Sequence, residues 1–460
     1  MLGLGILSAY PQDSIVAIPD TTFLFALIDE GVDTDGDSVI SYGEAEAVTS
    51  LDVSDSIYFF FGWNSMGEIK CLFGIQAFTK LKILNCSGNL LTGLDVSENT
   101  SIEELYCNGN SLTGLDVSNN NALTVLECGL NQITSLDISN NKPLTKLECG
   151  ENRISSLDVS ENTILAELNC SQNALNVLDV SNNAALTVLH CADNQLTSLD
   201  VSNNFALTIL DCEFNQLTRL DVSKSTALTE LYCPFNDLTS LDVSNNPALT
   251  ILDCGWNNSI GLNVLNNTAL KEIYCQDIDI TSLDVSNNLE LVILVCENNP
   301  LTYLDISNNI ALEKFDCSGT QLEKLDISNN QALKIFICDS TPTLKEVCVW
   351  TMPFPPEGVD VGDWGCPDLY YTTECTTSND ETNLTELTIF PNPIGAILTI
   401  ETVIPDQYRI DITSLNGQLI LSKKFDGTTH QLDLSSFKPG VYFITIRSDE
   451  ILTTEKIIKL

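Results

Sequence analysis

Thirteen cysteines recur at a constant interval of 21 residues, and this spacing constrains the fold more than any other feature of the sequence. They occupy positions 86, 107, 128, 149, 170, 191, 212, 233, 254, 275, 296, 317 and 338. The unit from Leu123 to Pro143 reads LTVLECGLNQITSLDISNNKP, and its neighbours follow the scheme L-x-x-L-x-C-x-x-N-x-L-x-x-L-D-V-S-x-N-x-x. A fixed period of this length predicts a solenoid in which each turn contacts only its neighbours.

The first half of each unit alternates apolar and polar residues, as a half-buried strand does. In the chosen unit, Leu126 and Cys128 are expected to point inward and Glu127 outward. The roughly ten residues of the return contain D-x-S-N-N, which favours turns and a short extended piece over a helix. Stacked units would place in-register strands about 4.8 Å apart around one continuous core.

The period lies within the range of about 20–29 residues that characterises leucine-rich repeats. The unit resembles the cysteine-bearing leucine-rich repeats of the internalin J type, a family of bacterial surface adhesins, over about residues 78–348. In that family, Cys replaces an inward Leu. The resemblance implies a mainly β fold, a curved right-handed solenoid and an adhesin role.

The cysteine row has two interpretations. Each Cys occupies an inward apolar position, where a free thiol packs as a small hydrophobe, but a row of disulfides or metal sites is the alternative. In-register parallel side chains rarely reach disulfide geometry, so buried, reduced thiols are predicted. Four cysteines lie outside the row, at 71, 348, 366 and 375. The last three could form one structural disulfide, whose pairing the sequence leaves open.

Two polar residues also recur with the period. An Asn three residues after Cys runs from Asn89 to Asn257 and is expected to satisfy backbone groups in a buried ladder. An Asp in the L-D-V-S or L-D-I-S element runs from Asp95 to Asp326, interrupted by Asn263. Each Asp could accept hydrogen bonds from its own turn, or the row could form a line of cation sites.

An acidic segment before the repeats has the spacing of a calcium loop. Oxygen ligands would fall at loop positions 1, 3, 5, 7, 9 and 12, which are Asp33, Asp35, Asp37, Val39, Ser41 and Glu44. The segment resembles an EF-hand loop, or the half-site of a dockerin, except that Ser38 replaces the usual Gly at position 6. We predict a structural calcium ion that stiffens the cap over the first repeat. An acidic surface loop is the alternative.

The C-terminal residues 387–460 read as a compact all-β module with short alternating strands and turns. The module resembles the C-terminal sorting domain of the type IX secretion system of Bacteroidetes. The resemblance rests on Pro391, Asn392, Pro393, Gly417, Gly440, Tyr442, Lys456 and Lys459. It implies recognition by that secretion machinery, export across the outer membrane, removal of the domain, and release or surface attachment. An ordinary small β-sandwich is the alternative.

The remaining segments complete the expected domain order. Residues 1–15 are read as a signal-peptide remnant, although no basic residue precedes Lys70. Residues 16–77 form an N-terminal cap with the EF-hand-like loop, and 78–348 form the solenoid. Residues 349–377 form a C-terminal cap, because a solenoid end must be covered. Residues 378–386 form a polar linker to the sorting module.

Composition excludes several function classes. There are 63 acidic and 20 basic residues, giving a net charge of −43, so nucleic acid and anionic membranes are poor partners. No apolar run reaches the ~18 residues of a transmembrane helix. The two histidines, His190 and His430, lie in different domains, which excludes a zinc site with several histidines. Nothing near either one supports a catalytic triad.

Aromatic residues gather on the outward positions of the later repeats. Phe214, Phe235 and Trp256 stand two residues after Cys, while Tyr232, Asp253 and Tyr274 stand one residue before it. Acidic residues surround them at positions 211, 213, 230 and 272. Grouped, solvent-facing aromatics predict a binding surface for a protein or glycan. Alternatively, the rings fold over the repeat edge and pack against neighbouring turns.

The leading hypothesis for function is therefore a secreted or cell-surface binding protein that serves adhesion or recognition, not an enzyme. One alternative is a structural surface repeat without a specific ligand, which a uniform outer strand face would favour. Another is a non-catalytic subunit of a secreted enzyme.

Overall fold

The computed structural model describes residues 14–54, 69–375, 388–390, 397–414, 419–438, 440–447 and 452–459. The predicted signal-peptide segment 1–15 therefore lies almost wholly outside the described residues, as does the linker 378–386. Contacts divide the chain into two compact units, Met1–Thr373 and Glu374–Leu460.

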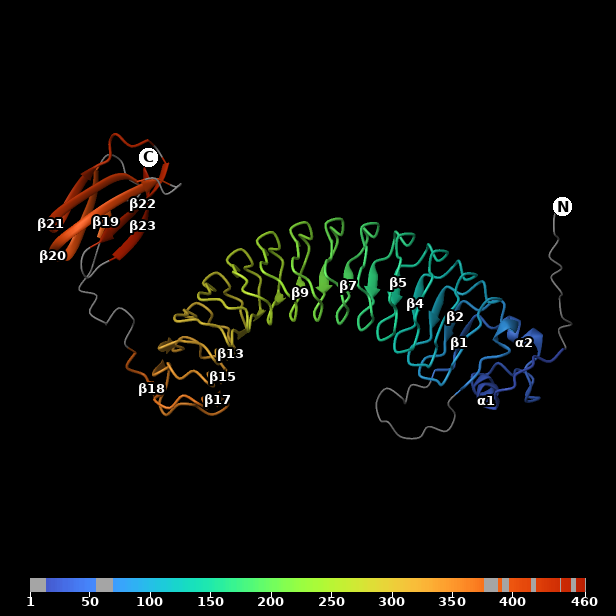
Figure 1. Ribbon diagram of the computed structural model, residues 1–460. Helices are drawn as coiled ribbons and strands as arrows, with labels where there is room; N and C mark the ends of the chain where they lie inside the picture. Colours follow the sequence, from blue (N-terminus) through green and yellow to red (C-terminus); the bar gives the residue numbers. More distant parts are fainter. Residues whose placement is uncertain are drawn as a thin grey trace. The chain divides into compact units, whose positions relative to one another are not determined.

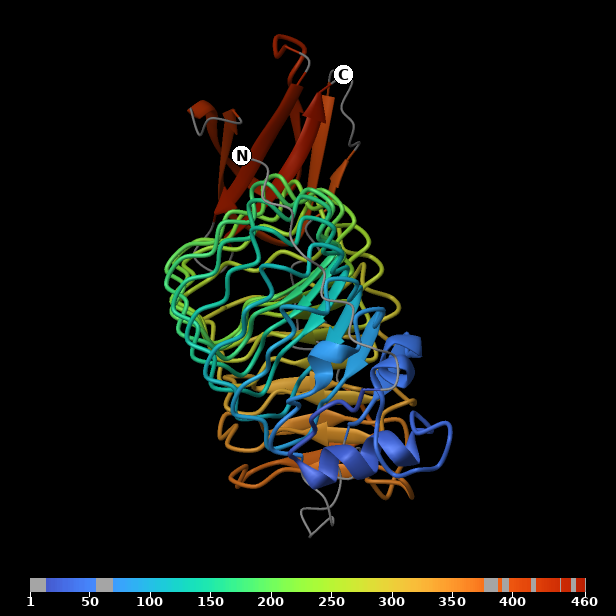
Figure 2. The ribbon, with the colours of Figure 1, turned by 90° about the vertical axis from the view of Figure 1, so that its right-hand side faces the viewer.

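The first unit is a parallel solenoid with one short strand per turn (Figure 1). Fifteen strands form one sheet, and they lie along one side of the stacked turns (Figure 2). They are β1 Ser50–Asp52, β2 Ile83–Asn85, β3 Glu104–Tyr106, β4 Val125–Glu127, β5 Lys146–Glu148, β6 Glu167–Asn169, β7 Val188–His190, β8 Ile209–Asp211, β9 Glu230–Tyr232, β10 Ile251–Asp253, β11 Glu272–Tyr274, β12 Ile293–Val295, β13 Lys314–Asp316, β15 Ile335–Ile337 and β17 Asp360–Gly362.

The register of these strands follows the 21-residue period. Leu105 pairs with Leu126 and Leu126 with Leu147, so equivalent residues of successive turns are direct neighbours. The middle residue of each repeat strand is buried and the first and third residues point outward. We call these outward positions the strand face. The predicted mainly β leucine-rich-repeat solenoid is confirmed.

All thirteen cysteines of the row are free and fully buried in the core. Burial raises the pKa of thiols such as Cys128 well above its usual value, so the thiols stay protonated. The predicted burial and packing of these thiols is confirmed, and their reduced state stays a prediction. The Asn ladder is also present: Asn131 Nδ2 donates to the carbonyl oxygens of Cys107, Cys128 and Gly129, and its Oδ1 accepts from Leu112 N.

The row of Asp residues in the return half makes the turn hydrogen bonds that the structural interpretation predicted. Asp116 Oδ1 accepts from Ser118 N at 2.9 Å, and the same bond recurs in later turns. These hydrogen bonds from the Ser side chain and backbone lower the pKa of Asp116. Sequence reasoning missed a second buried ladder, which contains Asn120 and Asn141. In this ladder Asn141 Nδ2 donates to the carbonyl oxygens of Val117 and Asn120.

The N-terminal end of the solenoid is covered by two helices, α1 Thr21–Asp29 and α2 Tyr42–Ala47, and the 3-10 helix η1 Ile75–Ala77 lies before the first repeat. Asp20 caps α1, accepting from the backbone N–H groups of Thr22 and Phe23. Phe23 and Leu27 lie one turn apart on α1, and their buried side chains belong to the same core as the repeats.

At the other end, the return halves become strands. β14 Lys324–Asp326, β16 Glu346–Cys348 and β18 Tyr370–Thr372 form a second parallel sheet. The segment predicted as a cap thus continues both sheets through β17 and β18. Fifteen of the seventeen cysteines are free, and the other two, Cys348 and Cys375, are disulfide-bonded. Cys366 is free, and its thiol donates to Cys338 O at 2.9 Å.

The second unit is an antiparallel sheet of five strands: β19 Thr388–Phe390, β20 Ile397–Ser414, β21 Leu419–Asp433, β22 Gly440–Arg447 and β23 Leu452–Lys459. The register between β20 and β21 shifts between Glu401 and Asp406, dividing both strands into two parts. Leu398 of one part and Ile410 of the other pack into a single core.

Candidate binding surface

The strand face of β8 to β11 alternates acidic and aromatic residues. The in-register pairing places Asp211 beside Tyr232, Tyr232 beside Asp253 and Asp253 beside Tyr274. Neighbouring strands are about 4.8 Å apart, so these four side chains form one short row across four turns. Three of them, all except Asp211, were predicted as ligand-binding residues.

This row lines a hollow of 450 Å³, which we call the acidic hollow. Its lining residues are Asp211, Glu213, Tyr232, Ile251, Asp253, Glu272 and Tyr274. Four of the seven carry carboxylates, and the sequence had placed three of these around the aromatic residues without indicating a cavity. Glu230 is not part of the lining.

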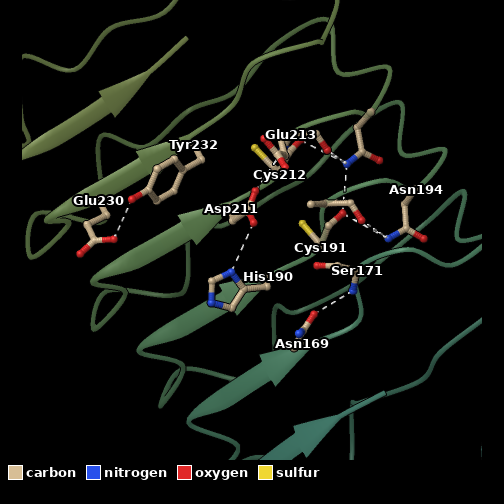
Figure 3. Close-up of polar contacts among 12 residues, drawn as sticks. Asn169, Ser171, His190, Cys191, Asn194, Asp211, Cys212, Glu213, Glu230 and Tyr232 are labelled. Atoms are coloured by element: carbon tan, nitrogen blue, oxygen red, sulfur yellow. Dashed lines mark hydrogen bonds and ion pairs between the residues drawn. The ribbon is translucent and has the colours of Figure 1, made fainter. Parts of the chain in front are cut away.

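Each tyrosine of the hollow is held by a glutamate two residues earlier on the same strand. Tyr232 donates its hydroxyl to Glu230 at 3.0 Å (Figure 3), and Tyr274 donates to Glu272 at 2.9 Å. Burial, followed by this hydrogen bond, raises the pKa of Tyr274 to about 12. The signal in the sequence is Glu-x-Tyr, which also occurs at Tyr106, but it was not recognised from the sequence.

Within the acidic hollow, Asp253 is the carboxylate whose pKa its surroundings change most. Burial raises its pKa to about 6, and the charge of Asp211 adds to this, although a hydrogen bond from Gly255 N at 3.2 Å opposes it. Burial likewise raises the pKa of Glu213. Among the described residues, no Lys, Arg or His nitrogen lies within 4.0 Å of a carboxylate oxygen of Glu213, Asp253 or Glu272.

One basic side chain, that of His190, lies at the edge of the hollow. His190 Nδ1 is 3.4 Å from Asp211 Oδ2, from the neighbouring strand β7 (Figure 3). This contact raises the pKa of His190, against an opposing effect of burial. His190 therefore gains positive charge more readily than an ordinary histidine and offsets only the first of the four carboxylates.

The predicted aromatic residues Phe214, Phe235 and Trp256 stack on one another in the turns that follow the strands. Ring centroids are 4.2 Å apart for the first pair and 4.3 Å for the second, with interplanar angles of 10°. Phe214 remains 47% exposed and Trp256 37% exposed. We call these three residues the aromatic stack. The rings pack across turns, as the alternative expected, and still present apolar area to solvent, while the binding surface stays a prediction.

The stack occupies a backbone position that does not favour large side chains. The residue two after Cys has a positive φ in these turns: 49° at Phe214, 52° at Phe235 and 50° at Trp256. Other repeats use Gly88 or Gly109 there. A non-glycine residue in this left-handed region costs about 1–2 kcal/mol. The positive φ also explains why the stack lies at the turn and is not part of the hollow lining.

The predicted calcium loop gathers part of its ligand set. Carboxylate oxygens of Asp33, Asp35 and Asp37 lie within 4.8 Å of one another. Glu44 instead accepts from Thr34 and Ser41 with its two oxygens, closing the cap of α2. Hydrogen bonds from these residues, that of the Ser41 backbone foremost, lower the pKa of Glu44 to about 2. The backbone N–H groups of Val39 and Ser41 donate to the side chains of Asp37 and Glu44, respectively. Calcium binding by this loop stays a prediction.

The predicted sorting residues fall partly outside the described residues, namely Pro391, Asn392, Pro393 and Gly417. The others lie on the pair β22–β23. Gly440 pairs with Lys459 and Phe443 with Lys456. Tyr442 donates its hydroxyl to Lys438 O at 2.8 Å, across the turn that leads into β22.

Comparison with known proteins agrees with this architecture. The functional domain of InlJ from Listeria monocytogenes, which includes a cysteine ladder, aligns with 96% of this chain and 97% of its own, at 28% identity and a TM-score of 0.62. Residues 388–460 match the secretion system C-terminal sorting domain family. The chain is a leucine-rich-repeat protein with a C-terminal sorting domain. Both predicted resemblances are confirmed.

Other structures share the leucine-rich-repeat fold. The protein LIC12759 from Leptospira interrogans covers 65% of this chain and 86% of its own, at 22% identity and a TM-score of 0.57. The alignment with the LRIM1/APL1C complex covers 65% of this chain and 61% of the matched chain, at 19% identity and a TM-score of 0.50. No curated protein sequence matches the chain.

The sorting domain assigns this leucine-rich-repeat protein to the outside of the cell, either secreted or attached to the outer-membrane surface. In the described part of the chain, no helix has the length and apolar content needed to cross a bilayer.

Proposed function

We propose that this leucine-rich-repeat protein is a binding protein that recognises a partner at or outside the cell surface, and that the aromatic stack and the acidic hollow form its main contact site. The observation that carries the proposal is the aromatic stack. Three large rings on successive turns keep exposed area at positions where glycine would suit the backbone better.

The energetics of the stack support a role beyond stability. Stacking contributes about 0.5–1.5 kcal/mol per ring pair beyond the area it buries. The left-handed backbone costs about 1–2 kcal/mol at each of the three residues. The two ring pairs together contribute about 1–3 kcal/mol, against about 3–6 kcal/mol for three left-handed residues, so stacking does not offset the backbone cost of Phe214, Phe235 and Trp256. Exposed aromatic clusters of this kind are typical of the residues that dominate binding energy in interfaces.

The non-uniform strand face argues against a purely structural repeat. A catalytic role is not proposed either. Among the described residues, the His190 side chain has a hydrogen-bond contact with Asp211 but none with a Ser, Thr or Cys side chain. A nucleophile–His–Asp arrangement is therefore not assembled around this histidine.

The test is a screen of the full chain on protein and glycan arrays, followed by affinity measurements with a double variant, Phe235→Ala with Trp256→Ala. We expect the double variant to lose about 2–4 kcal/mol of binding free energy while keeping its circular dichroism spectrum. Leu130→Ala is the matched control, since Leu130 is an exposed residue with positive φ at the equivalent turn position. A partner that binds the parent and the double variant equally would place the site elsewhere.

We also propose that a calcium ion stabilises the N-terminal cap, with Asp33, Asp35 and Asp37 as its main ligands. Calcium prefers several carboxylate and carbonyl oxygens, and these three carboxylates already converge. Calcium should raise the melting temperature of the cap, and Asp33→Ala should abolish that shift. Asp35→Asn, which retains a side-chain acceptor for Asp37 N, should weaken the shift. No calcium response in the parent would refute the site.

A further inference from the structure

We propose that the acidic hollow receives arginine or lysine side chains of a polypeptide partner, while the neighbouring aromatic stack contacts the apolar part of the same segment. This inference rests on the proposed binding function and specifies the chemistry of the partner.

The charge pattern of the strand face supports a cationic partner. Some outward carboxylates elsewhere are paired with lysines of the chain: Glu127 meets Lys146 at 2.7 Å. Similar pairs join Lys82 to Glu103 and Lys334 to Glu313. In the hollow, by contrast, three of the four carboxylates have no described cation within 4.0 Å. A half-buried carboxylate without a counter-charge is costly, and a basic side chain from a partner would remove that cost.

The hollow offers hydrogen-bond acceptors, so it favours a ligand whose polar groups are all hydrogen-bond donors. Its lining side chains offer carboxylate oxygens and ring faces, and the two tyrosine hydroxyls already donate to Glu230 and Glu272. A sugar needs donors as well as acceptors around its hydroxyl groups, whereas Lys and Arg carry donors and no acceptor. The hollow therefore fits basic side chains better than a glycan.

The alternation of Asp and Tyr suits the same groups. A guanidinium or ammonium group beside Asp253 would make charge-assisted hydrogen bonds. The faces of Tyr232 and Tyr274, one strand away on either side, would add cation–π attraction. The aromatic stack begins one residue after Glu213 of the hollow, so one extended segment can contact both surfaces.

The chain itself provides a substitution that tests the hollow without disturbing the turn. Asp253 Oδ1 accepts from the backbone N–H two residues later, and Asn85 and Asn169 make the same bond at the equivalent position of their repeats. Asp253→Asn therefore removes the charge and keeps the turn bond. Asp158→Asn is the matched control, because it removes one carboxylate from the return half, where Ser160 N donates to it.

The probe is a fluorescent hexa-arginine peptide, titrated against the full chain by anisotropy at physiological salt, with hexa-citrulline as its uncharged counterpart. We expect Asp253→Asn to weaken hexa-arginine binding about tenfold, equivalent to ~1.4 kcal/mol. Asp158→Asn should change it less than twofold, and hexa-citrulline should not bind. Equal losses in both variants would show diffuse attraction to the net charge and overturn the inference.

Three further outcomes separate this inference from its alternatives. Saturable calcium binding that Asp253→Asn removes, in a chain whose Asp33 loop has been disabled, would assign the hollow to a metal ion and overturn the inference. A partner from the arrays that depends on Phe235 and Trp256 but not on Asp253 would also overturn it, while leaving the proposed function intact. A partner that depends on none of these residues would refute both.

Discussion

Two stretches of one strand face carry carboxylates, but they differ in whether a lysine of the chain pairs with them. On β4 and β5, Glu127 is paired with Lys146 at 2.7 Å, and the turns that follow carry Leu130 and Glu151 at the position that the aromatic stack occupies in later repeats. On β8 to β11, the acidic hollow lacks such a lysine among the described residues, and the following turns carry the aromatic stack. Backbone register and buried residues are equivalent in both stretches. The repeat thus maintains the fold while outward positions are free to specify recognition.

The largest expected effect tests whether the scaffold is indeed equivalent in the two stretches. Asn131 and Asn215 each donate to three carbonyl oxygens and accept from one backbone N–H of a neighbouring turn. Replacing either residue by Ala removes these hydrogen bonds from the buried backbone groups. We expect the free energy of unfolding to fall by about 2–4 kcal/mol in each case. Urea denaturation measures it, with Asn140→Ala as control, since Asn140 is exposed and donates only to Ser118 O. Markedly unequal losses would contradict the comparison.

The next prediction concerns the charge that the hollow leaves without a counter-ion. Because the folded pKa of Asp253 is raised to about 6, its neutral form favours folding. That stability is fully present below about pH 4 and is lost as pH rises through 6. Asp253→Asn should therefore stabilise the protein by about 1–2 kcal/mol at pH 7.5 and have almost no effect at pH 3.5. Stability that is equal or lower at pH 7.5 would show that this carboxylate is already compensated.

The smallest effect concerns the lysine of the earlier stretch. Lys146→Gln removes the partner of Glu127, and because Lys146 is partly exposed we expect a loss below about 1 kcal/mol. The same change should make this stretch a weak second site for hexa-arginine. Lys142→Gln is the control, because its pair with Glu161 is more exposed. If Lys146→Gln left peptide binding unchanged, the lack of a local cation would not be what distinguishes the hollow.

The sequence predicted the features that recur in every repeat, but not those that depend on the conformation of an individual turn. Inward positions such as Leu126 and Cys128 have the same surroundings in every repeat, so spacing alone revealed them. The residue two after each Cys has a positive φ, which the sequence does not indicate when that residue is Phe235 or Trp256. Because of this backbone conformation, the aromatic stack lies in the turn and not on the strand.

Two features depended on contacts between segments. The disulfide at Cys348 and Cys375 depends on the return strands β16 and β18 becoming neighbours, which the repeat scheme did not predict for residues 349–377. The acidic hollow arises only when Tyr232 and Tyr274 flank Asp253 across three strands. Apart from Ile251, its lining residues were identified from the sequence as a group, but the Glu–Tyr pairs that hold the rings were not.

Oxidative footprinting of the full chain with and without hexa-arginine tests the central claim most directly. The tyrosines provide an internal comparison, because Tyr106 has the same hydroxyl contact with Glu104 as Tyr232 has with Glu230 but lies outside the hollow. We expect the peptide to protect Tyr232, Tyr274 and Trp256 and to leave Tyr106 unchanged. Equal protection of Tyr106, or none at Tyr232 and Tyr274 with the peptide bound, would contradict the assignment of β8 to β11 as the binding surface.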